Sequence, residues 1–134
     1  MTRMIFVNIA VKKLDRAVAF FKRLGFEFNQ QFTDENATCM IVNEHAFVML
    51  LVEPRFKDFT KKPICNSATH TEAILAISAE SREKVQELVK TALEAGGKPA
   101  NDPVDYGFMY NASFHDPDDH LWEVVWMDPN AVKK

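Results

Sequence analysis

The chain opens with a short apolar run whose two faces differ. Residues 4–11 are rich in Ile and Val and too short for a helix before the polar Lys12 and Lys13, so we predict a strand. One face of this strand is all aliphatic, whereas the other carries Asn8 in its middle. We therefore expect the aliphatic face to pack on a helix and the Asn8 face to line something else.

A helix with clear ends follows the first strand. Residues 14–25 place apolar side chains at helical spacing, with Asp15 placed to cap the start and Gly25 to supply a left-handed end. The first half of the chain then continues with strands, so its predicted order is βαβββ. These three strands are predicted at residues 26–32, 37–42 and 46–52.

The second half repeats this order after a stretch rich in Pro and Lys. Residues 53–70 have no regular pattern and read as a linker or surface loop, in which Phe56 and Phe59 either anchor a helical turn or act as a lid. Residues 72–79 then predict a strand, and Ser81 caps a helix that ends at two glycines. Further strands are predicted at residues 98–103, 108–114 and 121–127.

The two halves align as copies of one unit. Superimposing the first strands sets Phe6 against Glu72, and superimposing the last strands sets Met49 against Glu123. Neither half is large enough to bury much surface alone. We therefore predict a single α+β domain of two tandem βαβββ modules. Its limits are 1–134 for the domain, 1–52 for the first module, 53–70 for the linker and 71–134 for the second module.

Composition narrows the function classes. With 47% apolar residues and a formal charge of −3, the chain predicts a globular domain without the basic patch that a nucleic-acid partner requires. The longest strongly apolar stretch, 46–52, is far shorter than the roughly 20 residues of a membrane helix, and the start lacks the pattern of a signal peptide. Cys39 and Cys65 form no CxxC pair. We expect a cytoplasmic protein with inert thiols.

Two motifs carry a family resemblance. The run from Asn8 to Phe26 fits V-x-x-L-x-x-A-x-x-F-[FY]-x-x-L-G-F, and the run from Phe114 to Val124 contains D-P-D-x-x-L-x-E. Together they resemble the vicinal oxygen chelate superfamily, which contains glyoxalase I, bleomycin-resistance proteins and extradiol dioxygenases. The resemblance implies sheets that curl into a half-open barrel with helices outside and a cup inside. It also implies a small-molecule ligand in that cup and a homodimer.

The resemblance also locates the positions that bind metal in some members, one on each of four strands. These positions fall on Phe6, Met49, Glu72 and Glu123. Phe6 has no donor atom and Met49 offers only a soft thioether, so two of the four positions keep a donor suited to a hard cation. The resemblance therefore favours a protein that binds a small organic molecule without a complete metal site. One alternative is a metal-dependent lyase, isomerase or dioxygenase that uses a divalent ion. Another is an interaction domain whose cup is vestigial.

Each candidate residue has two interpretations. Glu123 is a metal ligand or general base, or it pairs with a nearby Lys or Arg at a sheet edge; Glu72 shares that site or lies at a solvent-facing strand end. If both face one cavity, their repulsion suits proton abstraction beside a carbonyl. Asn8 either holds a substrate oxygen or bonds a neighbouring side chain. Tyr110 either walls an aromatic ligand pocket or packs against the sheet. Phe6 and Met49 would line the ligand.

The remaining features carry less chemistry. The usual D-P-D-G turn of the family ends here in Asp119, so an Asp is expected to take the left-handed position. The chain has no phosphate-binding glycine loop, no G-x-S-x-G and no Cys/His nucleophile pair, so nucleotide hydrolysis and acyl-enzyme chemistry have no support. Four histidines are expected at the surface: His45, His70, His115 and His120.

Overall fold

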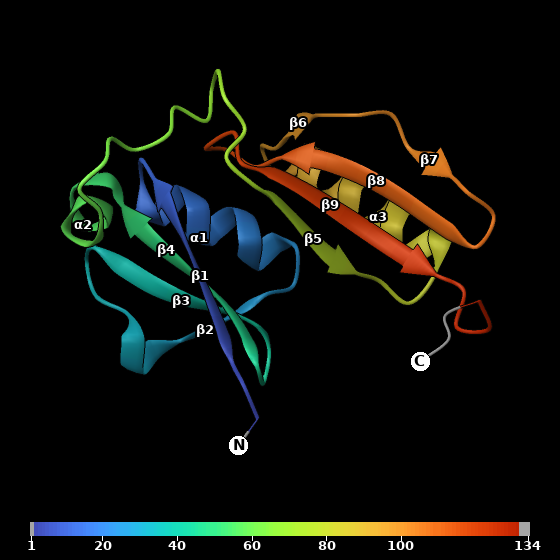
Figure 1. Cartoon of the computed structure of the whole chain (residues 1–134), viewed down its shortest axis with the longest axis horizontal. Helices are drawn as coiled ribbons and strands as arrows, with labels where there is room; N and C mark the ends of the chain where they lie inside the picture. The colour runs from blue at the N-terminus through green and yellow to red at the C-terminus, as the bar shows by residue number, and fades with distance from the viewer. Residues whose placement is uncertain (1, 132–134) are drawn as a thin grey trace. The chain divides into compact units, whose positions relative to one another are not determined.

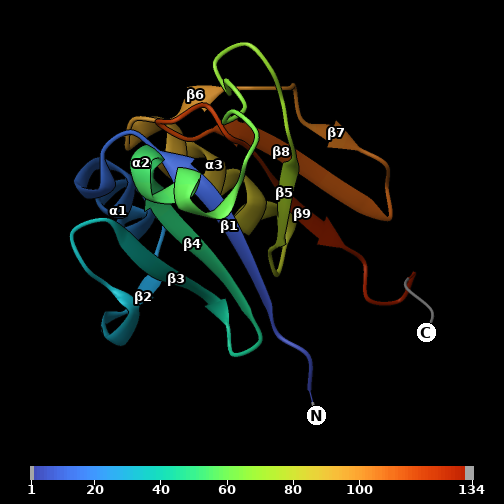
Figure 2. The same ribbon diagram turned by 60° about the vertical axis from the view of Figure 1, so that its left-hand side comes forward.

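The computed structural model describes residues 2–131. The chain divides into two compact units, Met1–Asn66 and Ser67–Lys134, and each is described by itself below (Figure 1; Figure 2 gives a turned view). Across the described residues, no helix has the length and apolar character needed to cross a membrane. The predicted α+β class with two βαβββ modules is confirmed.

The first unit contains one four-stranded sheet and one long helix. Its strand order is β1-β4-β3-β2, with β1 parallel to β4 and the other neighbours antiparallel. The elements are β1 (Ile5–Val11), α1 (Leu14–Arg23), β2 (Glu27–Asn29), η1 (Gln30–Phe32), β3 (Ala37–Asn43), β4 (Ala46–Val52), α2 (Glu53–Phe56) and η2 (Lys57–Phe59).

The second unit repeats this topology. Its strand order is β5-β9-β8-β6, with β5 parallel to β9 and with β7 as a further short partner of β8. The elements are β5 (Ile74–Ser78), α3 (Arg82–Glu94), β6 (Lys98–Pro99), β7 (Val104–Asp105), β8 (Met109–His115) and β9 (Leu121–Met127). Strand β9 is therefore an inner strand, which decides the surroundings of every side chain on it.

Each helix covers one face of its own sheet. Side chains of α3 line a groove together with Tyr110 and Ala112, so α3 covers the face on which these residues lie. The register places Trp122 and Val124 on the same face, and both are almost fully buried. Since the first unit repeats the topology, the equivalent Leu50 lies under α1. We call the opposite, helix-free side of each sheet its open face.

Helix α1 forms because its apolar residues fall on one stripe. Ala17, Phe20 and Phe21 are buried, and the ring of Phe21 meets Phe20 edge to face with the ring centroids 4.9 Å apart. Burial of two such aromatic side chains stabilises the unit by about 2–3 kcal/mol each. The helix therefore owes its position to packing on the sheet, as the prediction from sequence required.

The helix ends agree with the sequence except at one cap. The Ser81 hydroxyl accepts a hydrogen bond from the backbone N–H of Lys84 at 3.1 Å, so it caps α3 as predicted. Gly25 has φ +99° after α1, as predicted. Asp15, however, lies inside the first turn of α1, where Lys13 is the N-cap residue and no side chain caps the helix. At that position the Asp15 carboxylate interacts favourably with the helix dipole, but it does not cap a specific N–H group.

Several strands are shorter than the alternation predicted. Strand β2 stops at Asn29, because the Asn29 side chain accepts the backbone N–H of Gln31 at 3.0 Å and turns the chain into η1. Strand β5 begins at Ile74 rather than at residue 72, and only two residues of the expected strand 98–103 pair as β6. Within the expected loop 53–70, the residues from Glu53 to Phe59 form α2 and η2, so this part of the stretch is helical.

The turn between β8 and β9 is built around one buried carboxylate. Asp116 is 1% exposed, and it accepts hydrogen bonds from the backbone N–H groups of Asp118 and His120 at 2.9 and 3.0 Å and from Trp122 Nε1 at 2.9 Å. Burial raises the pKa of Asp116, while the charge of His120 and these hydrogen bonds act in the opposite direction. Asp119 takes the left-handed position at φ 67°, as predicted. This turn sets the register of β9.

Candidate functional site

Glu123 lies in the middle of β9 on the open face of the second unit. It pairs with Ala76 of β5 on one side and with Ser113 of β8 on the other, so small side chains flank the carboxylate. The residue is half-buried, and its side chain makes no hydrogen bond or ion pair with any residue from 2 to 131. A structural ion pair at a sheet edge is therefore absent within this range, and the strand is not an edge strand.

Ser113 and His115 of β8 are among the polar residues that share this open face with Glu123. The Ser113 hydroxyl is already hydrogen-bonded. It accepts from the backbone N–H of Asn101 at 2.9 Å and donates to the backbone carbonyl oxygen of Asn101 at 3.2 Å. His115 lies two residues further along β8, opposite Leu121 and diagonal to Glu123. The His115 Nδ1 atom is buried and has no hydrogen-bond partner among the described residues. The sequence prediction placed His115 at the surface, but the structure leaves it half-buried.

Glu72 is not brought into the same sheet. It lies two residues before the start of β5, and its side chain is exposed. An exposed carboxylate outside the strand has no register partner that would hold it beside Glu123. Of the two carboxylates that alternation from residue 72 placed on one face, only Glu123 therefore lies in a paired strand.

The open face of the first unit presents an aromatic stack. Phe6 of β1 and Phe47 of β4 are register partners, and their rings stack with centroids 5.0 Å apart at 14°. Asn8 and Met49 form the next register pair on this face. The Asn8 Nδ2 atom donates to the backbone carbonyl oxygen of Phe6 at 3.2 Å, so this hydrogen bond of the amide goes to the backbone and not to a neighbouring side chain. Phe6 is 49% exposed, which leaves one ring of the stack accessible.

Two of the four positions that the resemblance assigns to metal ligands carry no hard donor. Neither Phe6 nor Met49 supplies a hard donor, and Glu72 lies outside its strand. Within residues 2–131, no three His, Cys, Asp or Glu side chains are grouped so as to hold a metal ion. Burial raises the pKa of the Cys39 thiol.

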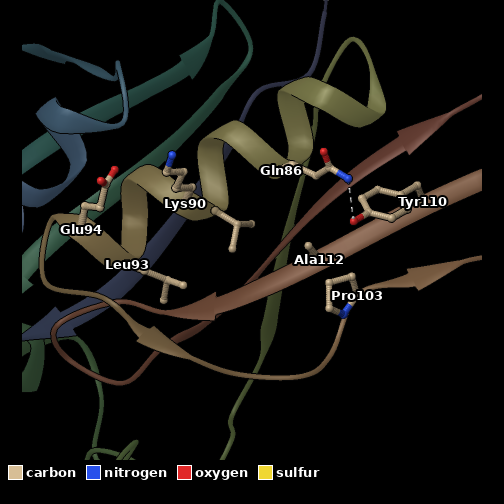
Figure 3. Close-up of a pocket in the computed structure, with 8 residues that line it drawn as sticks. Gln86, Lys90, Leu93, Glu94, Pro103, Tyr110 and Ala112 are labelled. Atoms are coloured by element: carbon tan, nitrogen blue, oxygen red, sulfur yellow. Dashed lines mark hydrogen bonds between the residues drawn. The ribbon is translucent and has the colours of Figure 1, made fainter.

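Tyr110 lies on the opposite side of its sheet from Glu123. It faces α3, where the Gln86 Nε2 atom donates to the Tyr110 hydroxyl at 3.3 Å (Figure 3). A groove of about 460 Å³ opens there between α3 and β8. Its lining residues are Gln86, Val89, Lys90, Leu93, Glu94, Pro103, Tyr110 and Ala112. The sequence analysis offered Tyr110 as the wall of a ligand pocket, and Tyr110 lines this groove, but the contribution of α3 was not predicted. The irregular stretch before β8 was the available signal.

Comparison with known proteins agrees with this topology. A family model described as "Bleomycin resistance protein-like N-terminal" matches residues 3–43. A hypothetical protein from S. aureus superposes with a TM-score of 0.80 at 23% identity, over 94% of each chain. The chain has the glyoxalase/bleomycin-resistance fold. The resemblance to the vicinal oxygen chelate superfamily is thereby confirmed at the level of fold and N-terminal motif.

Two further solved structures show how widely this glyoxalase/bleomycin-resistance fold is used. A glyoxalase-related enzyme from Fulvimarina pelagi has a TM-score of 0.80 at 14% identity, covering 94% of this chain and 88% of its own. The fosfomycin resistance protein FosX from Listeria monocytogenes has a TM-score of 0.68 at 15% identity, covering 97% of both chains. No curated protein matches the sequence significantly. Structural similarity at such low sequence identity establishes the fold alone, so the activity has to be argued from the residues.

Proposed function

We propose that this protein binds a small, partly aromatic organic molecule and that it does so without a complete metal site. The observation that carries the proposal is the Phe6–Phe47 stack on the open face of the first unit. A flat ring with one accessible face offers offset stacking to an aromatic ligand, worth about 0.5–1.5 kcal/mol beyond the area that the ligand buries. The side-chain oxygen of the neighbouring Asn8 can accept a hydrogen bond from the rest of the ligand, and the flexible Met49 thioether can adapt to its shape.

Protein-observed NMR tests this proposal directly. Aromatic fragments titrated into the ¹⁵N-labelled protein should shift the backbone resonances of Phe6, Asn8 and Phe47, and Phe6→Ala should weaken the binding. Phe32→Ala is the matched control, because Phe32 is also an exposed phenylalanine, at 59%, but it lies in η1 away from the stack. A library whose hits never perturb the open face of the first unit, or bind equally well to Phe6→Ala, would contradict the proposal.

The metal part of the proposal has its own test. Protein purified without chelator should carry well under one equivalent of tightly bound divalent metal, because Phe6 and Met49 replace two donors that metal-using members supply. Elemental analysis after dialysis measures this directly. Stoichiometric zinc, nickel or iron would reject it. We also expect glyoxalase I activity, assayed on the glutathione hemithioacetal of methylglyoxal, to be absent or marginal, and chelator-sensitive turnover would reject that expectation.

A metal-dependent lyase, isomerase or dioxygenase is the second candidate. Glu123 favours it, since a half-buried carboxylate without a partner on an inner strand is costly to keep unless it has a use. Replacing Glu123 with Gln should then leave thermal stability unchanged or raise it, whereas breaking a buried ion pair would lower stability by about 3–5 kcal/mol. Added Zn²⁺, Ni²⁺ or Mn²⁺ should raise the melting temperature of the parent protein and not that of Glu123→Gln if this candidate holds.

Location and assembly belong to the proposal as well. We expect a cytoplasmic protein, because the sequence contains only two cysteines and they form no CxxC pair, which fits a reducing compartment. We also expect a homodimer, on the basis of the family resemblance. Sedimentation velocity at micromolar concentration tests the dimer, and a single species of 15.3 kDa would contradict it.

A further inference from the structure

We propose that the groove between α3 and β8 is a second ligand site, which takes a neutral, mostly apolar molecule that carries one oxygen able to accept a hydrogen bond. The groove lies on the helix-covered side of the sheet, and Glu123 lies on the other side. The proposal is therefore independent of the function proposed for the open faces. The volume of the groove, about 460 Å³, falls within the roughly 300–1,000 Å³ typical of small-molecule sites.

The apolar part of the groove comes from both walls. Val89 and Leu93 contribute from α3, and Pro103 and Ala112 contribute from the strand side. In Figure 3, Leu93 points from the helix toward the strand and Pro103. Leu93 remains 39% exposed although it belongs to the face of α3 that meets the sheet. A ligand in the groove would therefore remove apolar surface from water that the fold alone leaves exposed.

One end of the groove supplies a directed hydrogen bond. The Tyr110 hydroxyl oxygen accepts from Gln86 Nε2 at 3.3 Å, and the Tyr110 side chain makes no other hydrogen bond with residues 2–131. Because the oxygen is occupied as an acceptor, its own hydrogen is available to donate. A ketone, ether or similar oxygen on the ligand is the complement of this donor.

The charges beside the groove favour a neutral ligand. Lys90 and Glu94 are one helical turn apart and carry opposite charges, so their fields largely cancel at the groove. Figure 3 shows both side chains on the side of α3 that faces away from the strand. An anionic or cationic ligand would thus gain little attraction, and would lose its hydration among apolar walls.

Prodan, a neutral naphthalene dye with one ketone oxygen, is a suitable probe. Titration should give saturable binding with a blue shift of the emission, as expected when the dye leaves water. Leu93→Gln should weaken binding by roughly fivefold to tenfold through lost apolar contact. Tyr110→Phe, which removes only the hydroxyl, should weaken it by roughly threefold to tenfold. Phe32→Gln is the control, since it makes another exposed apolar residue polar outside the groove.

The outcomes separate this site from the open faces. Binding that survives in Phe6→Ala but weakens in Leu93→Gln supports the groove, whereas the reverse assigns the dye to the open face of the first unit and overturns the groove. An absence of saturable binding up to the solubility limit of the dye also overturns it. If sedimentation instead shows self-association that Leu93→Gln abolishes, with no dye binding, the groove is an interface between copies and the proposal of a ligand site is wrong.

Discussion

Replacing Asp116 with Ala should destabilise the second unit clearly more than replacing it with Asn. The carboxylate is buried, and its Oδ1 atom accepts the backbone N–H groups of Asp118 and His120 at 2.9 and 3.0 Å. Its Oδ2 atom accepts Trp122 Nε1. Asn keeps one oxygen that can serve the two backbone donors, whereas Ala leaves all three donors without a partner.

The size of the gap follows from those hydrogen bonds. Both variants are neutral and both lose the bond from the indole, so the cost of burying a charge cancels between them. The remaining difference is two backbone hydrogen bonds at about 0.5–1.5 kcal/mol each, plus the penalty for leaving buried donors unpaired. Asp116→Ala should therefore be less stable than Asp116→Asn by about 2–3 kcal/mol.

Urea unfolding followed by tryptophan fluorescence measures this gap, because Trp122 and Trp126 both lie in β9. At an unchanged slope of about 1–3 kcal/mol per molar urea, the midpoint of the Ala variant should lie about 1 M or more below that of the Asn variant. Asp128 is the matched control: its Oδ1 atom accepts one exposed N–H, from Asn130 at 2.9 Å, so its Ala and Asn variants should differ by only a few tenths of a kcal/mol. Equal midpoints for the two Asp116 variants would refute the reasoning.

Three further predictions concern single side chains. Burial raises the pKa of Asp116, so at this group the folded unit binds more protons than the unfolded chain does. The free energy of unfolding of the parent protein should therefore fall as the pH rises from 4 toward 7. Asp116→Asn should lack this slope. Ser81→Ala should cost about 1 kcal/mol because it removes a cap, whereas Asp15→Ala should cost only about 0.3–0.5 kcal/mol, and similar costs in urea unfolding would contradict the assignment of the caps. Gly25→Ala should lower stability by about 1 kcal/mol through backbone strain alone, since no atom lies within 4 Å of the added Cβ; an unchanged melting temperature would count against this.

The local sequence determined the elements and their repeat. Strands 46–52 and 121–127 have the predicted limits, because each is a mostly apolar run bounded by polar residues. The position of Asp119 in a left-handed conformation also followed from the turn motif alone. These features depend on backbone preferences and side-chain periodicity over a few residues, so they can be derived without knowing what lies next to them.

The tertiary structure decided which of the candidate residues can act together. A period of two says that residues 123 and 125 share a face, but it does not say that β9 lies between β5 and β8, and this placement makes Glu123 an inner-strand carboxylate flanked by Ala76 and Ser113. In the same way, the register of β8 with β9 puts Tyr110 on the side opposite Glu123, and the packing of α3 on that side opens a groove beside it. Strand order and helix packing arise from contacts between residues distant in the chain, and no local pattern records them.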